Sequence, residues 1–458
     1  MFKPEKFKGK KACVLGLGRS GRYVAKLLAD HGFKVLISEE HQPTHIPDFP
    51  AHISVETGGH TSQVFTCGFI VKSPGIFPKS PVLKEAKKRK IPVFSELEVA
   101  LSFMPAGIEV LAVSGTNGKT TTTSLLGEIL KEYCAQKQPQ RQVFVTGNIG
   151  KPVSSVSNEI KKGDFLVLEV SSYQLEDSTF FRPNVACLLN ITPDHLDHHG
   201  GMINYMKAKA RLFSNQRRSD IAILNGADPF CAALARQIKA QLGAFSAQPN
   251  HALKTDVFYD GDEIIFSMGY RLRPPKLKGI HNVENAMAAA LCALAVGVGP
   301  DVIQKAFDRF EPMEHRIEPF AYHRGVIYIN DSKATNLDST VIALKSFEKT
   351  KNIWLILGGR DKGASYSVLA PYVHDHCKGI LTIGESMDKI EQELKTDVPI
   401  VRGGDLKTVV DYLFQTAEKG DIVLLSPACA SFDQFKSYEE RGRIFKELVN
   451  THIKKARQ

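Results

Sequence analysis

The stretch VLAVSGTNGKTT, residues 110–121, places an apolar run directly before a loop of glycine, threonine and asparagine. The run predicts a buried strand, and Lys119 to Lys131 predict the helix that follows. Backbone N–H groups of such a loop bind phosphates, the lysine reaches the β- and γ-phosphates, and the Thr120 hydroxyl can bind Mg²⁺. Val113 stands where the usual motif has its first glycine. A ligand-free glycine turn is the alternative, but the position between strand and helix favours a nucleoside triphosphate site.

A second glycine loop, Gly16-Leu17-Gly18-Arg19-Ser20-Gly21, follows the apolar run that starts at Lys11. With Glu39 or Glu40 about 20 residues later, it satisfies the G-x-G-x-x-G pattern of dinucleotide sites. An NAD-dependent dehydrogenase is therefore one interpretation. The same backbone geometry holds any diphosphate, including that of a UDP-sugar, and a triphosphate loop has no role in a simple dehydrogenase.

Length and composition favour a multidomain globular protein, because 458 residues with 43% apolar residues suffice for about three domains with a core each. The chain has no run of about 18 apolar residues and no signal segment, so we expect a cytoplasmic protein without membrane insertion. Eight cysteines without metal or disulfide spacing predict reduced core thiols. The net charge of +10 is spread along the chain, which indicates solvated charge or small anionic substrates and no nucleic-acid partner.

Apolar runs alternate with helical segments and restart twice, which predicts three α/β domains. Further strands are expected at 34–38, 165–170, 185–190, 326–329, 353–357, 379–383 and 422–425, and a buried helix at 285–295. We expect a Rossmann-like N-terminal domain at 1–107, a central P-loop ATPase-like domain at 108–312 and a Rossmann-like C-terminal domain at 313–458.

Polar residues gather where the predicted strands end. Glu169 ends the run FLVLEV and is the candidate acid for Mg²⁺. Residues 190–199, NITPDHLDHH, are dense in possible metal or phosphate ligands but lack zinc spacing. Lys207 and Lys209 follow in NYMKAKARLF, where composition alone predicts solvated lysines on an amphipathic helix. The regions 330–336, 358–363 and 426–435 should converge at one sheet edge, where Lys333, Lys362, Thr335 and Ser431 suit an acidic substrate.

The chain resembles the muramyl ligases, which join amino acids to a UDP-linked muramic acid. The resemblance runs along the whole chain, through GTNGKTT at 115–121, TGNIG at 146–150, EVSSYQLE at 169–176, HNVENAMAA at 281–289, MEHRIE at 313–318, NDSKATN at 330–336 and SPACASFDQF at 426–435. The GLGRSG opening, SPG at 73–75 and SPACASFDQF resemble the branch that adds D-glutamate. The resemblance implies an ATP- and Mg²⁺-dependent amide ligase with an acyl phosphate intermediate, acting on small-molecule substrates, and we expect a monomer.

The resemblance also implies roles for individual residues. ATP would lie on Gly115, Thr116, Asn117, Gly118, Lys119, Thr120, Thr121, Asn282, Asn285, Arg316 and Asp331. The UDP substrate would bind Gly18, Arg19, Ser20, Glu39, Ser73, Pro74, Gly75, Asn148 and His195. D-glutamate would bind Thr335, Lys362, Ser431, Phe432 and Tyr438. The metal ligands would be Thr120, Glu169, His195 and a carbamylated Lys209, and the catalytic residues Lys119, Glu169, His195 and Lys209.

This chain departs from the family at two of these positions, since Glu39 stands where an Asp is frequent and Tyr438 where a Phe is frequent. A P-loop regulatory switch that hydrolyses ATP without a UDP-sugar is a further alternative. The nearest one is a ligase of the same family that adds another amino acid.

Overall fold

The computed structural model describes residues 2–43, 45–248, 253–277, 279–311 and 314–456, which form three sheets. The chain divides into two compact units. The first contains residues 1–191, 203–275 and 283–310, and the second contains residues 192–202, 276–282 and 311–458. No described helix is both long and apolar enough to cross a membrane.

The N-terminal sheet is entirely parallel, with strand order β3-β2-β1-β4-β5. Its strands are β1 (Lys11–Leu15), β2 (Lys34–Ser38), β3 (Ile53–Glu56), β4 (Phe69–Lys72) and β5 (Val93–Ser95). Its helices are α1 (Arg19–Asp30), α2 (Pro81–Lys88) and α3 (Glu96–Ser102). Alternate residues of β1 face opposite cores, Val14 with Val24 of α1 and Cys13 with Val82 of α2. Helices therefore cover both faces of the sheet, as expected for this fold class.

The middle sheet has nine strands in the order β14-β13-β12-β11-β10-β9-β6-β8-β7. They are β6 (Glu109–Ser114), β7 (Val143–Gly147), β8 (Phe165–Glu169), β9 (Val185–Leu188), β10 (Ile221–Asn225), β11 (Gln241–Ser246), β12 (Val257–Tyr259), β13 (Ile264–Phe266) and β14 (Arg271–Leu272). The helices of this part of the first unit are α4 (Lys119–Lys137), α5 (Ser172–Glu176), α7 (Met202–Ala210), α8 (Pro229–Ala235), α9 (Ile280–Leu294) and α10 (Pro300–Arg309). The short helix α6 (Leu196–His199) belongs to the second unit. The seven strands β6 to β12 are all parallel. β13 and β14 extend the sheet beyond β12 as antiparallel strands.

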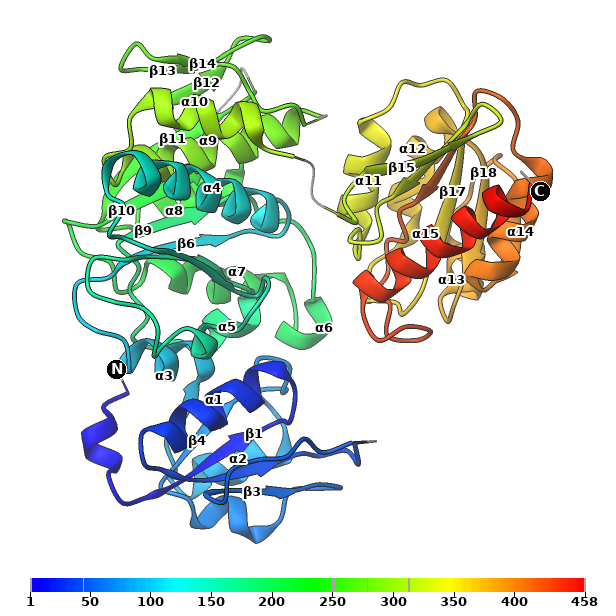
Figure 1. Cartoon of the computed structure of the whole chain (residues 1–458). Coiled ribbons are helices and arrows are strands. Elements are labelled where there is room, and N and C mark those ends of the chain that lie inside the picture. The colour runs from blue at the N-terminus through cyan, green and yellow to red at the C-terminus, as the bar shows by residue number, and fades with distance from the viewer. Residues whose placement is uncertain (1, 44, 249–252, 278, 312–313, 457–458) are drawn as a thin grey trace. The chain divides into compact units, whose positions relative to one another are not determined.

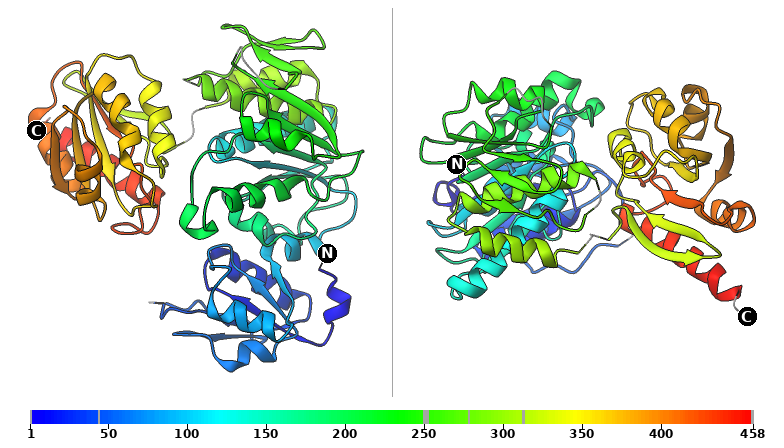
Figure 2. Two further views of the ribbon diagram at one scale, coloured as in Figure 1. Left: turned by 180° about the vertical axis from the view of Figure 1, so that it is seen from behind. Right: turned by 90° about the horizontal axis from the view of Figure 1, so that it is seen from above.

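The C-terminal sheet has the order β15-β16-β20-β17-β18-β19. Figure 1 draws this part of the chain in yellow to red. It contains β15 (Glu318–His323), β16 (Val326–Asn330), β17 (Ile353–Gly358), β18 (Cys377–Ile383), β19 (Ile400–Gly404) and β20 (Ile422–Leu425), with α11 (Leu337–Lys345), α12 (Ala370–His376), α13 (Met387–Glu393), α14 (Leu406–Thr416) and α15 (Tyr438–Lys455). One core contains residues of α11 and α12, and the other contains residues of α14 and α15. Figure 2 shows helices on both faces of this sheet.

The structure confirms the predicted α/β fold with three parallel-sheet modules and differs in detail. β15 pairs antiparallel with β16, a reversal that the sequence analysis did not predict. β19 was also missed, because its sequence IVRGG is not a buried apolar run. All eight cysteines are buried and free, as predicted. The domain border at 107 stays a prediction, and the border at 312–313 lies outside the described residues.

Within the first unit, charged side chains connect the N-terminal sheet to the middle sheet. Lys72 ends β4, and its side chain is 0% exposed. Its Nζ lies 3.1 Å from Glu176 Oε1 and 2.6 Å from Asp177 Oδ2. On α3, Glu96 accepts a hydrogen bond of 2.8 Å from Ser154 N, and Glu98 accepts one of 3.1 Å from Phe181 N. Buried carboxylates and one buried ammonium thus hold the two sheets together.

Replacing Lys72 with Met should lower the free energy of unfolding of the first unit by about 3 kcal/mol, because breaking one side of a buried ion pair leaves its partner poorly compensated. Urea unfolding followed by circular dichroism measures the loss. Lys84→Met, which changes an exposed lysine of α2, is the matched control. The protein's one tryptophan, Trp354, lies in the second unit, so its fluorescence transition should not move. Equal unfolding midpoints for both variants would contradict the structural role of Lys72.

Candidate active site

At two positions of the loop between β6 and α4, the backbone has a conformation that favours glycine. Gly115 has φ of 157° and Gly118 has φ of 85°. A Cβ atom on Gly118 would lie 2.2 Å from Asn285 Oδ1, so no side chain fits there. Asn117 N donates to Asn190 Oδ1 at 2.8 Å, and Asn190 Nδ2 donates to Asn117 O at 3.2 Å. This reciprocal pair fixes the loop to the end of β9.

The start of α4 supplies the donors of a phosphate site. Lys119 Nζ donates to Gly115 O at 2.9 Å and to Thr116 O at 2.7 Å, which holds the ammonium over the loop. The N-cap residue of α4 is Gly118, which has no side chain to accept hydrogen bonds from the first N–H groups of the helix. These N–H groups can therefore donate to a ligand. The buried Thr121 Oγ1 has no hydrogen-bond partner among the described residues. A glycine cradle, a helix N-terminus and a lysine together fit the phosphates of a nucleotide.

Glu169 and Asn148 lie together beside this loop. Glu169 ends β8, is 2% exposed, and pairs in register with Val113 of β6 on one side and Gly147 of β7 on the other. Asn148 Nδ2 donates to Glu169 Oε1 at 2.9 Å, and Asn148 N donates to Glu169 O at the same distance. A buried carboxylate next to a phosphate loop fits Mg²⁺, which prefers oxygen ligands.

Lys209 contacts the same loop from α7. Its side chain is buried, and its Nζ donates to Gly115 O at 2.7 Å. The ammonium lies 4.9 Å from the centre of the Tyr205 ring, and Tyr205 OH lies 2.9 Å from Thr116 Oγ1. Lys207 is exposed. Composition alone predicted two solvated lysines, and this was wrong for Lys209, because α7 turns it towards the phosphate loop.

The predicted UDP residues of the N-terminal sheet gather at the carboxyl ends of β1, β2 and β4. A Cβ on Gly16 would lie 2.9 Å from Ser73 Oγ, so the glycine loop and the SPG segment are adjacent. Glu39 Oε2 accepts a hydrogen bond of 2.7 Å from Leu17 N, and Glu39 Oε1 accepts one of 3.2 Å from His41 N. The Glu39 carboxylate thus orders the backbone of the glycine loop.

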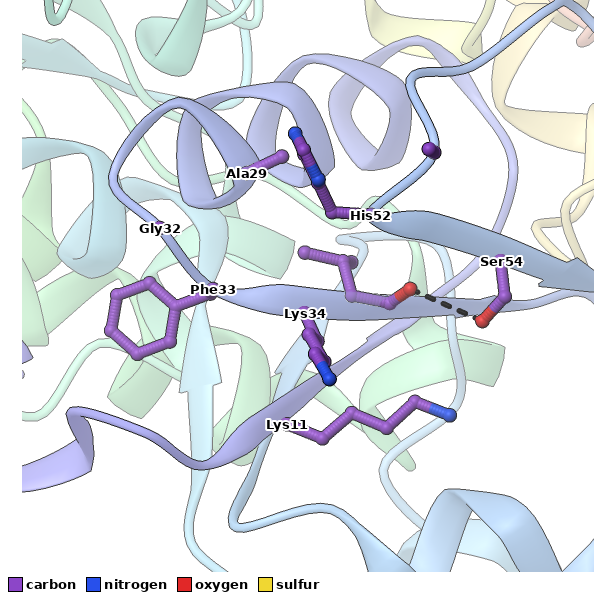
Figure 3. A pocket seen from close by; sticks show the side chains of 9 residues that line it. Lys11, Ala29, Gly32, Phe33, Lys34, His52 and Ser54 are labelled. Atoms are coloured by element: carbon purple, nitrogen blue, oxygen red, sulfur yellow. Dashed lines mark hydrogen bonds between the residues drawn. The ribbon is translucent and has the colours of Figure 1, made fainter.

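A pocket of about 520 Å³ lies at the opposite, amino end of the same strands (Figure 3). Lys11 and Lys34, the first residues of β1 and β2, line it together with His52. Because the glycine loop and Ser73 follow the carboxyl ends of the strands, this pocket is separate from the site predicted for UDP.

In the second unit, Asp194 connects the segment 192–199 to two loops of the C-terminal sheet. Its Oδ2 accepts a hydrogen bond of 3.0 Å from Asn336 Nδ2, and its Oδ1 lies 3.4 Å from Lys362 Nζ. The next residue, His195, has φ of 54°, in the left-handed region that a non-glycine residue rarely adopts. From the sequence, Asp194 was expected only as one of the possible ligands in the segment 190–199, with no individual role.

Asp331 is a buried carboxyl at the end of β16. Burial raises its pKa to about 7, and hydrogen bonds together with the nearby Arg316 guanidinium oppose the rise. Ser426 Oγ donates to Asp331 Oδ2 at 2.8 Å, and Ile317 N donates to Asp331 Oδ1 at 3.1 Å. Arg316 and Asp331, both predicted to contact ATP, are therefore close enough to interact.

The residues predicted for D-glutamate lie on loops at the carboxyl edge of the C-terminal sheet, except Tyr438, which begins α15. Lys333 Nζ donates to Tyr438 OH at 3.1 Å, and Thr335 N donates to Lys333 O at 2.8 Å, so these three residues are brought together. Ser431 is buried, whereas Phe432 is 63% exposed and packs little within its unit. Arg441 of α15 was not predicted, although it donates hydrogen bonds to the loops after β16 and β20.

Three family models match the chain: the MurD-like N-terminal domain at residues 10–95, the Mur ligase middle domain at 113–293 and the Mur ligase glutamate ligase domain at 315–429. A protein of Elusimicrobium minutum named UDP-N-acetylmuramoylalanine--D-glutamate ligase is 53% identical over 98% of this chain and 100% of its own length. A protein of Koribacter versatilis with the same name is 45% identical over 96% of this chain and 97% of its own.

Solved structures show the same fold. The UDP-N-acetylmuramate-alanine ligase of Thermotoga maritima aligns with a TM-score of 0.63 at 18% identity, over 97% of this chain and 100% of its own. The MurF ligase of Thermotoga maritima, solved in complex with ADP, aligns with a TM-score of 0.60 at 17% identity, over 100% of this chain and 98% of its own. With full-length relatives and all three domain models matched in order, the chain belongs to the Mur ligase family.

Proposed function

We propose that this chain joins D-glutamate to UDP-N-acetylmuramoyl-L-alanine in an ATP-dependent reaction of peptidoglycan precursor synthesis. The observation that carries the proposal is the 53% identity, over 98% of this chain and the whole of the other, to a protein named for this reaction. The phosphate loop agrees with it, because a dehydrogenase would have no role for Lys119 and its glycine cradle. We further propose that the protein acts as a monomer in the cytoplasm.

The reaction proceeds in two chemical steps. The alanyl carboxylate of the UDP substrate attacks the γ-phosphate of ATP and gives an acyl phosphate and ADP. The amine of D-glutamate then attacks the acyl carbon and gives up a proton to a base, and the tetrahedral intermediate collapses to the amide as phosphate leaves. In-line phosphoryl transfer depends on positioning and charge neutralisation, which Lys119, the glycine loop and the start of α4 supply.

Four residues would hold Mg²⁺, which neutralises phosphate charge when bound: Thr120, Glu169, His195 and carbamylated Lys209. Asn148 orients Glu169 through the 2.9 Å hydrogen bond to its Oε1. Asn285 lies against Gly118 and so restricts the shape of the phosphate loop. Asn282, Arg316 and Asp331 complete the proposed ATP contacts.

Two further residue sets would bind the other substrates. The UDP substrate would bind Gly18, Arg19, Ser20, Glu39, Ser73, Pro74, Gly75, Asn148 and His195. D-glutamate would bind Thr335, Lys362, Ser431, Phe432 and Tyr438. The adjacency of Gly16 to Ser73 supports the first set, and the grouping of Thr335, Lys333 and Tyr438 supports the second.

The test of this function is the product formed from UDP-N-acetylmuramoyl-L-alanine, ATP and a panel of D- and L-amino acids. Mass spectrometry should find the D-glutamyl product, with one ADP released for each amide formed. A product with another amino acid would assign the chain to a different ligase of the family. ADP release that is independent of the UDP substrate would instead indicate a P-loop switch.

The amino-acid pocket gives a more local prediction. Lys362→Ala and Ser431→Ala should raise the KM for D-glutamate about ten- to a hundredfold and that for ATP much less, because a charge-assisted hydrogen bond to a carboxylate contributes about 1.5–3 kcal/mol. Initial rates measured against each substrate test this. Lys395→Ala, which changes an exposed lysine of the same unit, is the control. Equal effects on both substrates would place the pocket elsewhere.

A further inference from the structure

Arg441 is the largest fully buried side chain among the described residues, and it lies in the first turn of α15. Its Nε donates to Ser332 Oγ at 2.9 Å, and its Nη2 donates to Ser332 O at 2.8 Å. Nη1 and Nη2 each donate to Cys429 O at 3.2 Å. Ser332 follows β16 and Cys429 follows β20, so one guanidinium joins the loops after two neighbouring strands.

The loop after β17 lies against the same guanidinium. A Cβ on Gly359 would lie 3.2 Å from Arg441 Nη1 and 2.3 Å from Ala430 O. Arg360 N donates to Ala430 O at 2.8 Å, and Ala430 N donates to Arg360 O at 3.1 Å, which joins this loop to the loop after β20. All three loops that the sequence analysis placed around one acidic substrate therefore meet at Arg441.

Ser332 joins the loop after β16 to the start of α15. Its Oγ accepts from Arg441 and donates to Tyr438 O at 2.8 Å, so the hydroxyl is held between two residues of α15. The neighbouring Gly442 allows the close approach, because a Cβ there would lie 2.3 Å from His315 Nδ1. The position of α15, and of Tyr438 at its start, is thus coupled to the loop after β16.

The charge of Arg441 is buried without an ion pair among the described residues, since its acceptors are the neutral oxygens of Ser332 and Cys429. Burial lowers its pKa to about 10, while the charges of Asp433 and Asp331 oppose that change, so the side chain stays protonated at neutral pH. A buried, unpaired cation is costly, and an apolar side chain in its place would avoid this cost.

We infer that Arg441 is a positioning residue for the acidic amino acid, holding the loops after β16 and β20 so that Thr335 and Ser431 face the substrate carboxylates. Thr335 is three residues beyond Ser332, and Ser431 is two residues beyond Cys429, so a shift of either anchor moves the donor that follows it. The inference rests on the proposed function, because it takes D-glutamate to be the substrate at these loops.

The experiment compares Arg441→Met and Arg441→Lys with Arg443→Met, which changes an exposed arginine two positions along α15. We expect Arg441→Met to raise the KM for D-glutamate about ten- to a hundredfold, with a smaller fall in kcat. Arg441→Lys keeps the charge without the forked donors and should restore part of the affinity. Arg443→Met should match the wild type. The Kd of the UDP substrate, measured by calorimetry, should stay unchanged in all three.

Trp354 fluorescence and thermal melting show whether the second unit of each variant is folded. If Arg441→Met does not fold, Arg441→Lys carries the test by itself. A wild-type KM for D-glutamate in a folded Arg441→Lys or Arg441→Met variant would overturn the inference. So would a fall in kcat with no change in KM, because that pattern indicates a structural role only. A wild-type enzyme that does not use D-glutamate would instead refute the proposed function.

Discussion

Lys119→Ala should reduce ADP formation by about 10²–10³-fold or more, because it removes the cation that neutralises charge on the transferred phosphoryl group. The ammonium lies over the loop, bonded to the Gly115 and Thr116 carbonyls, before any nucleotide arrives. It is therefore preorganised for phosphate. Alanine is a good helix former, so the start of α4 should remain folded.

Affinity for the UDP substrate should be retained in this variant, because the residues proposed to bind it lie on the N-terminal sheet. Calorimetry with that substrate alone measures it, and coupled detection of ADP measures turnover. Lys131→Ala, an exposed position of the same helix, is the matched control. Substrate-dependent ADP release at the wild-type rate would remove Lys119 from the phosphate site.

Lys209→Ala should be nearly inactive, and acetate should restore part of its activity. The prediction assumes that CO₂ adds to the neutral amine and converts a cation into an anionic oxygen ligand of the kind Mg²⁺ prefers. An unmodified ammonium at this position would repel the metal. The buried Nζ lies 2.7 Å from Gly115 O, next to the phosphate loop, and truncation to alanine leaves space into which a small carboxylate fits.

Lys207→Ala is the control, because Lys207 is exposed on the same helix and should tolerate replacement. Activity of both variants is measured with and without acetate, and intact-protein mass of the wild type tests for the added CO₂. A fully active Lys209→Ala enzyme would refute the carbamate. Acetate that raises the activity of Lys207→Ala equally would show a general salt effect.

The sequence predicted elements best where the periodicity was unambiguous. β2 and β20 begin and end where the apolar runs do, and α4 begins at Lys119 as the phosphate motif requires. The sequence prediction was incomplete. The buried strands β4 and β10 were not among those expected, and neither were β15 and β19, whose residues are only partly buried and lack the hydrophobic pattern of a core strand.

The candidate site was predictable where a local motif carries the chemistry, as at Gly118 and Glu169. Lys72 and Arg441 were not predictable, since each is an ordinary charged residue within a strand or helix pattern. Their roles arise from partners far along the chain, Glu176 for Lys72 and Ser332 for Arg441. Long-range burial of a charge has no signature in a single sequence.

The contacts of Glu96, Glu98 and Lys72 join two modules that separate family models match. Three family models match the chain, yet it divides into two compact units, with the N-terminal and middle sheets in one. Excision of the N-terminal module would separate Lys72 from Glu176 and Asp177, and Glu96 and Glu98 from the backbone N–H groups whose hydrogen bonds they accept. The N-terminal module that the family model matches therefore belongs to a larger compact unit, and its removal should lower the stability of that unit.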